Sequence, residues 1–294
     1  MVGQCYHTVT SVSTKTSESQ GEAQRDAYQQ LTCGLDSKIL KVDEDGISTV
    51  AVTVAQLRLS ARGEGGAENF DSSRPPVIPT DLSKLVGAVV GSTFNVAYTS
   101  NGQVIQISGM KELFQRVLKS VNPRSRDPEA AESAFRADFG DSVIRQLVTG
   151  FSCMPPGPVE IGGAWTNPAL SSLGLGPSLG FDSRLKTSLT LKKRVGGREV
   201  VAVQFATRKD DRGNRLDVGT ISELLALQTY GSGTYEIDEA TGWTTGYDFS
   251  TRGAGNMAVE DLTTADSSKP AAAYPIFFKS TVHMESKPVG APAN

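Results

Sequence analysis

YTSNGQVIQISGMKELFQRVLKSV, residues 98–121, is the stretch that decides the fold, because its pattern changes halfway. In the first half, Asn101-Gly102 separates two short alternating stretches, and Asn-Gly favours the positive φ angles of a tight hairpin turn. After Gly109 the apolar residues recur every three to four positions, which predicts an amphipathic helix directly after the hairpin. Such a helix is stable when its stripe covers another apolar surface. The stripe comprises Met110, Leu113, Phe114, Val117, Leu118 and Val121.

Strand patterns fill the sequence on both sides of this helix. Residues 3–108 and 159–286 contain stretches rich in Thr, Val, Leu and aromatic residues, separated by turn clusters, and these predict two β regions. Residues 109–151 are predicted to form a helical insert between the two regions. Residues 62–80 are rich in Gly, Ser and Pro, and we expect them to form a mobile loop.

The order of these elements predicts a mainly β (α+β) fold. A twisted antiparallel sheet has a concave face, and amphipathic helices are the natural cover for it. We therefore expect a bent antiparallel sheet or half-barrel in two lobes, with the central helical insert packed on the concave face. Residues 1–287 are expected to form a single two-lobed domain, and residues 288–294 a flexible tail.

The composition argues against several classes of protein. A total of 29 Lys and Arg against 32 Asp and Glu gives a net charge of −3, whereas a general nucleic-acid binder needs a basic surface. Charged residues make up 21% and hydrophobic residues 38% of the chain, which is typical of a globular protein. The sequence has no long apolar run, so we expect no transmembrane segment. No signal peptide is recognisable, which indicates a cytoplasmic protein or one whose targeting segment was removed.

Motifs for catalysis and metal binding are weak. Ser178 lies in Gly176-Pro177-Ser178-Leu179-Gly180, which matches the G-x-S-x-G motif of serine hydrolases. That motif needs a preceding strand and a following helix, but here a Gly-rich loop precedes it and a β pattern follows. The base would have to be His7 or His283, the two histidines of the chain. The three cysteines and two histidines show no paired ligand spacing, so we expect no metal and no cofactor.

Several short motifs occur in an order that resembles a known family. They are Gly3-Gln4-Cys5-Tyr6, Asn101-Gly102, Gly109-Met110-Lys111-Glu112-Leu113, Val159-Glu160-Ile161-Gly162-Gly163-Ala164-Trp165, Gly233-Thr234-Tyr235 and Thr241-Gly242. Their order resembles a large family of exported bacterial domains of unknown function, over nearly the whole chain. Gly163 departs from the family pattern, in which an acidic or polar residue is expected. The family has no established activity, so the resemblance supplies no functional residues.

The resemblance implies a place for the protein in the cell. Members of the family usually carry a secretion signal, so we expect export to the periplasm or cell envelope, with a cytoplasmic location as the alternative. The strand-rich plan with a helical insert is also similar, at the level of fold, to the bent half-barrel of periplasmic lipoprotein carriers.

The architecture favours a non-catalytic protein that binds an apolar or lipid-like ligand between the sheet and the helices. Leu113, Phe114, Val117 and Leu118 would line this site if the helices leave a gap above the sheet. If the helices fill the concave face, the alternative is a structural or protein-interaction module of the cell envelope. A serine hydrolase is the remote alternative. No nucleic-acid partner is expected, and the sequence names no protein partner.

The positions of two cysteines suggest a disulfide. A hairpin centred near Ser19 would place Cys5 opposite Cys33 on the neighbouring strand. At a non-hydrogen-bonded pair the Cα atoms lie about 4.5 Å apart, within disulfide range. An oxidising compartment would permit this bond and leave Cys153 as a free thiol. The alternative is that both cysteines are small buried apolar residues without a bond.

Overall fold

The computed structural model describes thirteen strands and two helices. The described residues are 2–20, 23–63, 66–78, 80–100, 102, 104–121, 148, 159–167, 185–195, 198–210, 214–218, 221–261 and 273–290. The strands are β1 (Cys5–Gln20), β2 (Ala23–Val42), β3 (Ser48–Gly63), β4 (Gly66–Asp71), β5 (Thr93–Tyr98), β6 (Val104–Ser108), β7 (Ala164–Asn167), β8 (Leu185–Val195), β9 (Arg198–Asp210), β10 (Asn214–Val218), β11 (Ile221–Asp238), β12 (Thr244–Asp261) and β13 (Ala273–Val289). The helices are α1 (Asp81–Val89) and α2 (Met110–Val121).

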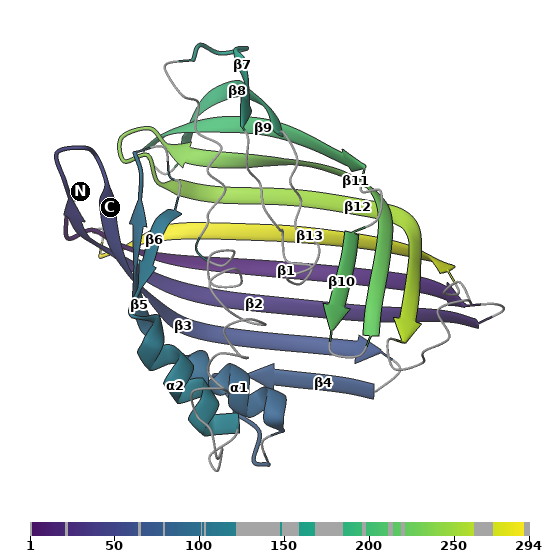
Figure 1. The fold of residues 1–294 in the computed structure, drawn as a ribbon. Helices are drawn as coiled ribbons and strands as arrows, with labels where there is room; N and C mark the ends of the chain where they lie inside the picture. Colours follow the sequence, from purple (N-terminus) through teal and green to yellow (C-terminus); the bar gives the residue numbers. More distant parts are fainter. Residues whose placement is uncertain are drawn as a thin grey trace.

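One bent antiparallel sheet contains all of these strands (Figure 1). Its main path follows the order β6-β5-β3-β2-β1-β13-β12-β11-β9-β8-β7, while β4 pairs with β3 and β10 pairs with β11. The first and last strands of the chain therefore lie side by side in the middle of the sheet. Along the described strands the path ends at β6 and β7, so the sheet is open. The predicted mainly β fold with one bent antiparallel sheet is confirmed.

The two faces of the sheet differ in polarity because side chains alternate along each strand. On β13, Phe278 and Val282 are buried, whereas Phe277 and Lys279, on either side of Phe278, are exposed. We call the face that bears Phe278 and Val282 the inner face, and the opposite one the outer face. The strand register extends this assignment across the sheet, and the buried valines of β3 lie on the inner face.

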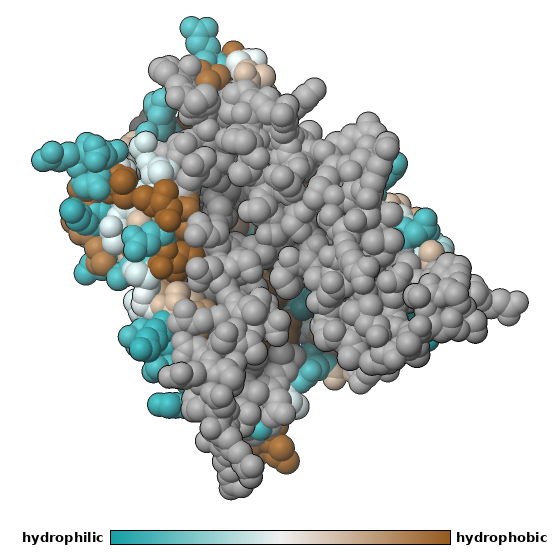
Figure 2. All heavy atoms as spheres, in the orientation of Figure 1, coloured by the Kyte–Doolittle hydropathy of each residue, from teal (hydrophilic) through white to brown (hydrophobic). Residues whose placement is uncertain are grey.

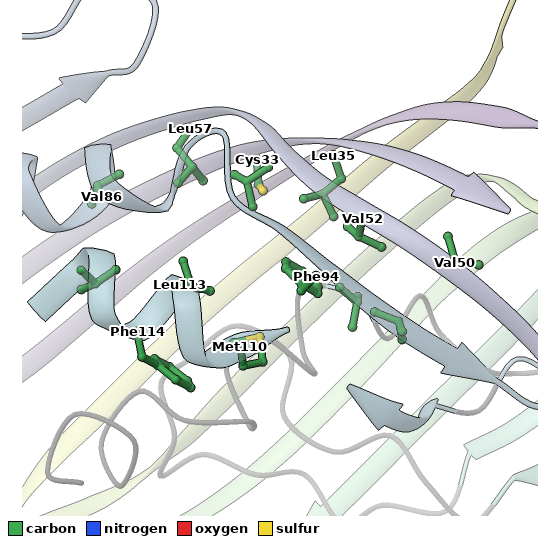
Figure 3. Packing of buried hydrophobic residues seen from close by; sticks show 14 of the residues in the cluster. Cys33, Leu35, Val50, Val52, Leu57, Val86, Phe94, Met110, Leu113 and Phe114 are labelled. Atoms are coloured by element: carbon green, nitrogen blue, oxygen red, sulfur yellow. The ribbon is translucent and has the colours of Figure 1, made fainter. Parts of the chain in front are cut away.

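The stripe of α2 is buried against the inner face of β3 and β5 (Figure 3). Gly109 has φ +83°, a left-handed conformation that glycine adopts readily, and this lets the chain pass from β6 into α2 without a loop. Leu113, Phe114 and Val117 are 4%, 2% and 1% exposed, and they join Phe94 in one hydrophobic core. The predicted helix and its burial on the sheet are thus confirmed.

Little else of the predicted helical insert falls within the described residues. Val148 is buried in the same core, and its carbonyl accepts a hydrogen bond from the Tyr98 hydroxyl at 2.9 Å. Burial also raises the pKa of Tyr98. The rest of residues 122–151 lies outside the described part of the chain.

The expectation of a loop over residues 62–80 is wrong for residues 62–63 and 66–71. β3 continues to Gly63, and Gly66–Asp71 forms β4, which pairs with β3. Thr80 then caps α1, because its side chain accepts a hydrogen bond from the backbone N–H of Ser83 at 3.2 Å. Glycine at both ends of the β3–β4 turn made this hairpin look like a loop. The sequence analysis also did not predict α1.

The two chain ends leave the sheet at the same end. Cys5 of β1 lies opposite Val289 of β13, so β13 runs beyond residue 287, where the tail was expected to begin. Val2 and Val289 are 62% and 56% exposed at this end. Apolar residues also gather on this side of the molecule in Figure 2, where Figure 1 places both termini.

Candidate functional site

The residues predicted to line a ligand site lie in the protein core. Leu113, Phe114 and Val117 are enclosed by side chains of β3, β5 and α1, and Leu118 is half-buried. In the described residues, these side chains pack against protein and fill this end of the inner face. Their contact with a ligand stays a prediction.

A second region of the inner face is open, and sequence reasoning missed it. The register aligns side chains of β1, β2, β3 and β4 into rows that cross the sheet. One row is apolar and consists of Val12, Leu31, Leu59 and Phe70. The next row toward the strand tips consists of Thr14, Gln29, Ala61 and Glu68. The inner face therefore changes from large apolar to small and polar side chains between two adjacent rows.

A groove of about 660 Å³ lies over the polar row and extends from it toward the strand tips. Its floor is made of small residues, which leave space above the sheet where large side chains would fill it. Its polar groups come from β1, β2, β3 and β4 and from Thr80, whose hydroxyl lies 2.6 Å from Glu68 Oε1. The lining comprises Thr14, Thr16, Ala27, Tyr28, Gln29, Ala61, Arg62, Gly63, Gly66, Ala67, Glu68 and Thr80. We call this the groove.

Thr80 ties helix α1 to the groove. Its hydroxyl donates a hydrogen bond to Glu68 Oε1 at 2.6 Å and accepts one from the backbone N–H of Ser83 at 3.2 Å. One side chain thus caps the helix and fixes the orientation of the carboxylate at the rim. β4 forms one side of the groove, and the hydrogen bond from Thr80 at the N-terminus of α1 holds Glu68 of β4 in place.

The polar row continues into the C-terminal strands. Thr14 lies opposite Ser280 on β13, and Ser280 lies opposite Thr251 on β12. The Thr14 and Ser280 hydroxyls are 3.1 Å apart, and the Thr251 hydroxyl donates to the carbonyl of Tyr230 at 3.1 Å. These three hydroxyls are buried, so the hydrogen bonds offset part of the cost of removing them from water.

The apolar row also continues, into a second core. Val12 lies opposite Val282, and Val282 lies opposite Phe249. These two partners belong to a cluster of buried residues on β9, β11, β12 and β13, against which Val12 and Met284 pack. The second core consists of Val203, Tyr235, Ile237, Tyr247, Phe249 and Val282. Apolar and polar rows thus run in parallel across the centre of the inner face.

Both histidines lie on the outer face and form pairs with aspartates of neighbouring strands. His7 Nδ1 is 2.6 Å from Asp36 Oδ1, and His283 Nδ1 is 2.6 Å from Asp248 Oδ1. The hydrogen bond with Asp248 is the main cause that raises the pKa of His283, and partial burial opposes it. Ser178, the serine of the hydrolase hypothesis, lies outside the described residues. The distance from Ser178 to either histidine is therefore outside what the structure describes, and the hydrolase hypothesis stays untested.

The predicted Cys5–Cys33 bond is wrong for this structure. The β1–β2 hairpin places Cys5 opposite Lys38 and Cys33 opposite Thr10, five positions away. Five residues along a strand span about 17 Å, far beyond the reach of a disulfide. The two side chains also lie on opposite faces, and both thiols are free. Burial raises the pKa of the Cys33 thiol to about 12. Cys153 is outside the described residues.

Neither a metal cluster nor a spanning helix occurs in the part of the chain that the structure describes. No group of three His, Cys, Asp or Glu side chains there is arranged to hold a metal ion. No helix there is long and apolar enough to cross a membrane.

A pattern in the sequence could have revealed the polar part of this face. In the N-terminal strand, threonine alternates with other residues: positions 8, 10, 14 and 16 are all Thr, and Val12 stands between the two pairs. All four lie on the inner face by the strand register, on either side of Val12. Alternating threonines on the face that packs inward indicate a face that is not simply a hydrophobic core. Glu68 and Thr80 had no such signal because they lie in the stretch that was expected to be a loop.

Comparison with known proteins identifies relatives in sequence and in fold. The model of a family of unknown function, DUF6263, matches residues 45–244. No curated protein matches the sequence. Lipovitellin has a similar fold, with a TM-score of 0.53 and 8% identity, over 100% of this chain and 26% of the lipovitellin chain. The present chain thus spans about a quarter of that protein.

Two further alignments are too poor to support an argument about fold. An outer membrane channel from Pseudomonas putida F1 aligns with a TM-score of 0.23 and 9% identity, over 98% of this chain and 96% of that one. An outer membrane lipoprotein-sorting domain from Vibrio parahaemolyticus aligns with a TM-score of 0.15 and 7% identity, over 97% of this chain and 87% of that one.

Proposed function

The chain belongs to DUF6263, a family of unknown function, and on that premise we propose that it is a non-catalytic protein that binds a lipid-like ligand in the groove. The observation that carries this proposal is the open groove of about 660 Å³ beside an apolar row on the inner face. This volume lies within the range of about 300–1,000 Å³ that is usual for small-molecule sites.

The chemistry of the groove fits an amphipathic ligand. Ala27 and Ala61 offer a floor of small apolar side chains on which an aliphatic chain can lie. Thr14, Gln29 and Glu68 offer hydroxyl, amide and carboxylate groups to a polar head. The apolar row borders the polar row, so both parts of such a molecule would meet matching side chains.

The fold is a second support for this proposal. Lipovitellin, whose structure was described in terms of lipid–protein interactions, has a similar fold over the whole of this chain. The site proposed here differs from the one predicted from the sequence, because the stripe of α2 is already buried against protein side chains.

The test is competitive binding of 1-oleoylglycerol against the fluorescent dye Nile red. We expect the parent protein to enhance the dye fluorescence, and the lipid to displace the dye in a saturable manner. Ala61→Phe places a ring on the groove floor and should weaken lipid binding at least about tenfold, because the ligand loses its apolar contact there.

Ser60→Phe is the matched control, since Ser60 neighbours Ala61 on β3 and lies on the outer face. It adds the same ring without filling the groove, and it should bind lipid as the parent does. Equal binding by the Ala61→Phe variant and the parent would contradict the groove as the site. A folded parent that binds neither dye nor lipid would favour a structural or protein-interaction module instead.

We also propose that the protein is exported to the cell envelope. The support is the resemblance of its motifs to exported domains. Fractionation of the host, with an antibody against this chain, tests this: the protein should appear in the envelope or periplasmic fraction, and recovery from the cytoplasm alone would contradict export.

A further inference from the structure

The outer face carries a row of basic residues that the proposed function does not use. The register aligns one residue from each of six neighbouring strands into this row. In spatial order they are Arg62, Tyr28, Lys15, Lys279, Arg252 and Tyr230. We call these residues the basic row. With strands about 4.8 Å apart, the row spans roughly 24 Å across the sheet.

Like charges face each other directly in this row. Lys15 lies opposite Lys279, and Lys279 lies opposite Arg252. Like charges at directly opposed positions destabilise a sheet. Lys15 pairs with Asp26 at 3.2 Å, whereas Lys279 and Arg252 are exposed and have no ion pair with any of the described residues.

Other charged positions on the outer face are arranged in the opposite way. His7 lies opposite Asp36, and His283 lies opposite Asp248, each at 2.6 Å. Arg58 of β3 pairs with a carboxylate of β4 at 3.1 Å. The sheet thus places opposite charges together at these three places, and the basic row differs from them. A dense polyanionic partner would relieve the repulsion within the row.

Exposed aromatic side chains accompany the basic row. Within the row, Tyr28 and Tyr230 are 41% and 40% exposed. Phe277, which is 53% exposed, lies two residues before Lys279 on β13 and therefore on the same face. Lysine and arginine next to tyrosine and phenylalanine are typical of surfaces that meet a bilayer, where cations contact anionic headgroups and aromatic rings enter the interface. The net charge of the chain is −3, so the basic row is a local feature.

We propose that the basic row is a docking surface for membranes rich in anionic phospholipid. The outer face would lie on the headgroups, with Lys279 and Arg252 near the centre of the contact and Phe277 in the interface. This inference does not depend on ligand binding in the groove. Tyr28 and Arg62, at one end of the row, also line the groove, but Lys15, Lys279 and Arg252 do not.

The test is sedimentation of the full chain with vesicles of phosphatidylcholine, with and without phosphatidylserine. The parent should sediment with the anionic vesicles alone, and added salt should release it. The double variant Lys279→Gln/Arg252→Gln should bind the anionic vesicles about fivefold more weakly for each charge removed. Phe277→Ser should also weaken binding to the anionic vesicles, but without changing its dependence on salt, because it removes an aromatic ring and no charge.

The matched control is Lys38→Gln/Lys287→Gln, which removes two positive charges from outer-face positions outside the row. It should bind as the parent does. Equal loss in both double variants, or equal sedimentation of the parent with both kinds of vesicle, would overturn the proposal. Binding of single-stranded RNA without binding of anionic vesicles would do so as well. Thermal melting verifies that each variant folds, and Lys279→Gln alone replaces the double variant if that one does not.

Discussion

At the scale of single residues, two glycines determine where the backbone can turn. Gly109 adopts φ +83° between β6 and α2, and a Cβ there would make ordinary contacts of 3.5–3.8 Å with Phe94 and the Thr93 carbonyl oxygen. At Gly163 a Cβ would lie 2.5 Å from Val159 Cγ1 and 2.9 Å from the Glu160 carbonyl oxygen. Space rather than dihedral angle requires glycine at Gly163, which accounts for its departure from the acidic or polar residue that the family resemblance led us to expect.

Gly109→Ala should lower the free energy of unfolding by about 1–2 kcal/mol, because an L-residue is strained in the left-handed conformation. Gly87→Ala is the matched control within α1. A Cβ at Gly87 would make ordinary contact with the Phe70 ring at 3.7 Å, so alanine there should stabilise the protein by about 0.5–1 kcal/mol through its helix propensity. Urea denaturation measures both, and a Gly109→Ala midpoint at or above that of the parent would contradict the argument.

The residue scale also shows where sequence reasoning failed. The pairing of Cys5 with Cys33 rested on a turn centred near Ser19, but β1 continues to Gln20 and β2 begins at Ala23. The tip of this hairpin is polar on both faces, so no apolar alternation marks its strands. A register that depends on the exact position of a turn cannot be derived from such residues.

At the scale of elements, α2 was predictable because its apolar stripe is long and regular. Its Met110, Leu113, Phe114 and Val117 are all buried as the pattern required. β4 and α1 were not predictable in the same way, since one has only six residues and the other nine. Their stability comes from pairing with β3 and packing on Phe70 and α2, which are contacts that local sequence does not display.

Leu113→Asp should unfold the protein or lower the free energy of unfolding by roughly 3 kcal/mol or more, because it places a carboxylate in the core beneath α2. Gln115→Asp introduces the same charge on the exposed side of the same helix and should change stability by less than about 0.5 kcal/mol. Thermal melting followed by circular dichroism compares the two. Similar melting of the Leu113→Asp variant and the parent would show that α2 is peripheral to the fold.

At the scale of the whole molecule, the sheet is held together by the pairing of its first and last strands. β1 and β13 pair from Cys5 with Val289 to Glu18 with Ile276. This pairing joins β2–β6 and the helices, which form one hydrophobic core, to β7–β12, which carry the other. The strand patterns predicted a bent antiparallel sheet, but its strand order could not be predicted, because contacts between residues so distant in sequence leave no local signal.

Removal of β13 should therefore affect both halves of the sheet at once. A chain that ends at residue 272 would lack the partner of both β1 and β12, and two long strand edges would be left open in the middle of the sheet. It would also lose the buried Ile276, Phe278 and Val282. We expect this chain to aggregate and to show no cooperative thermal transition. A chain that ends at residue 290 keeps all of β13 and should melt as the parent does.

Co-expression of residues 273–294 as a separate peptide with the chain of residues 1–272 should restore soluble protein, since the missing strand can pair again between β1 and β12. A soluble and cooperatively melting chain of residues 1–272 would show that the two halves fold without their central strand.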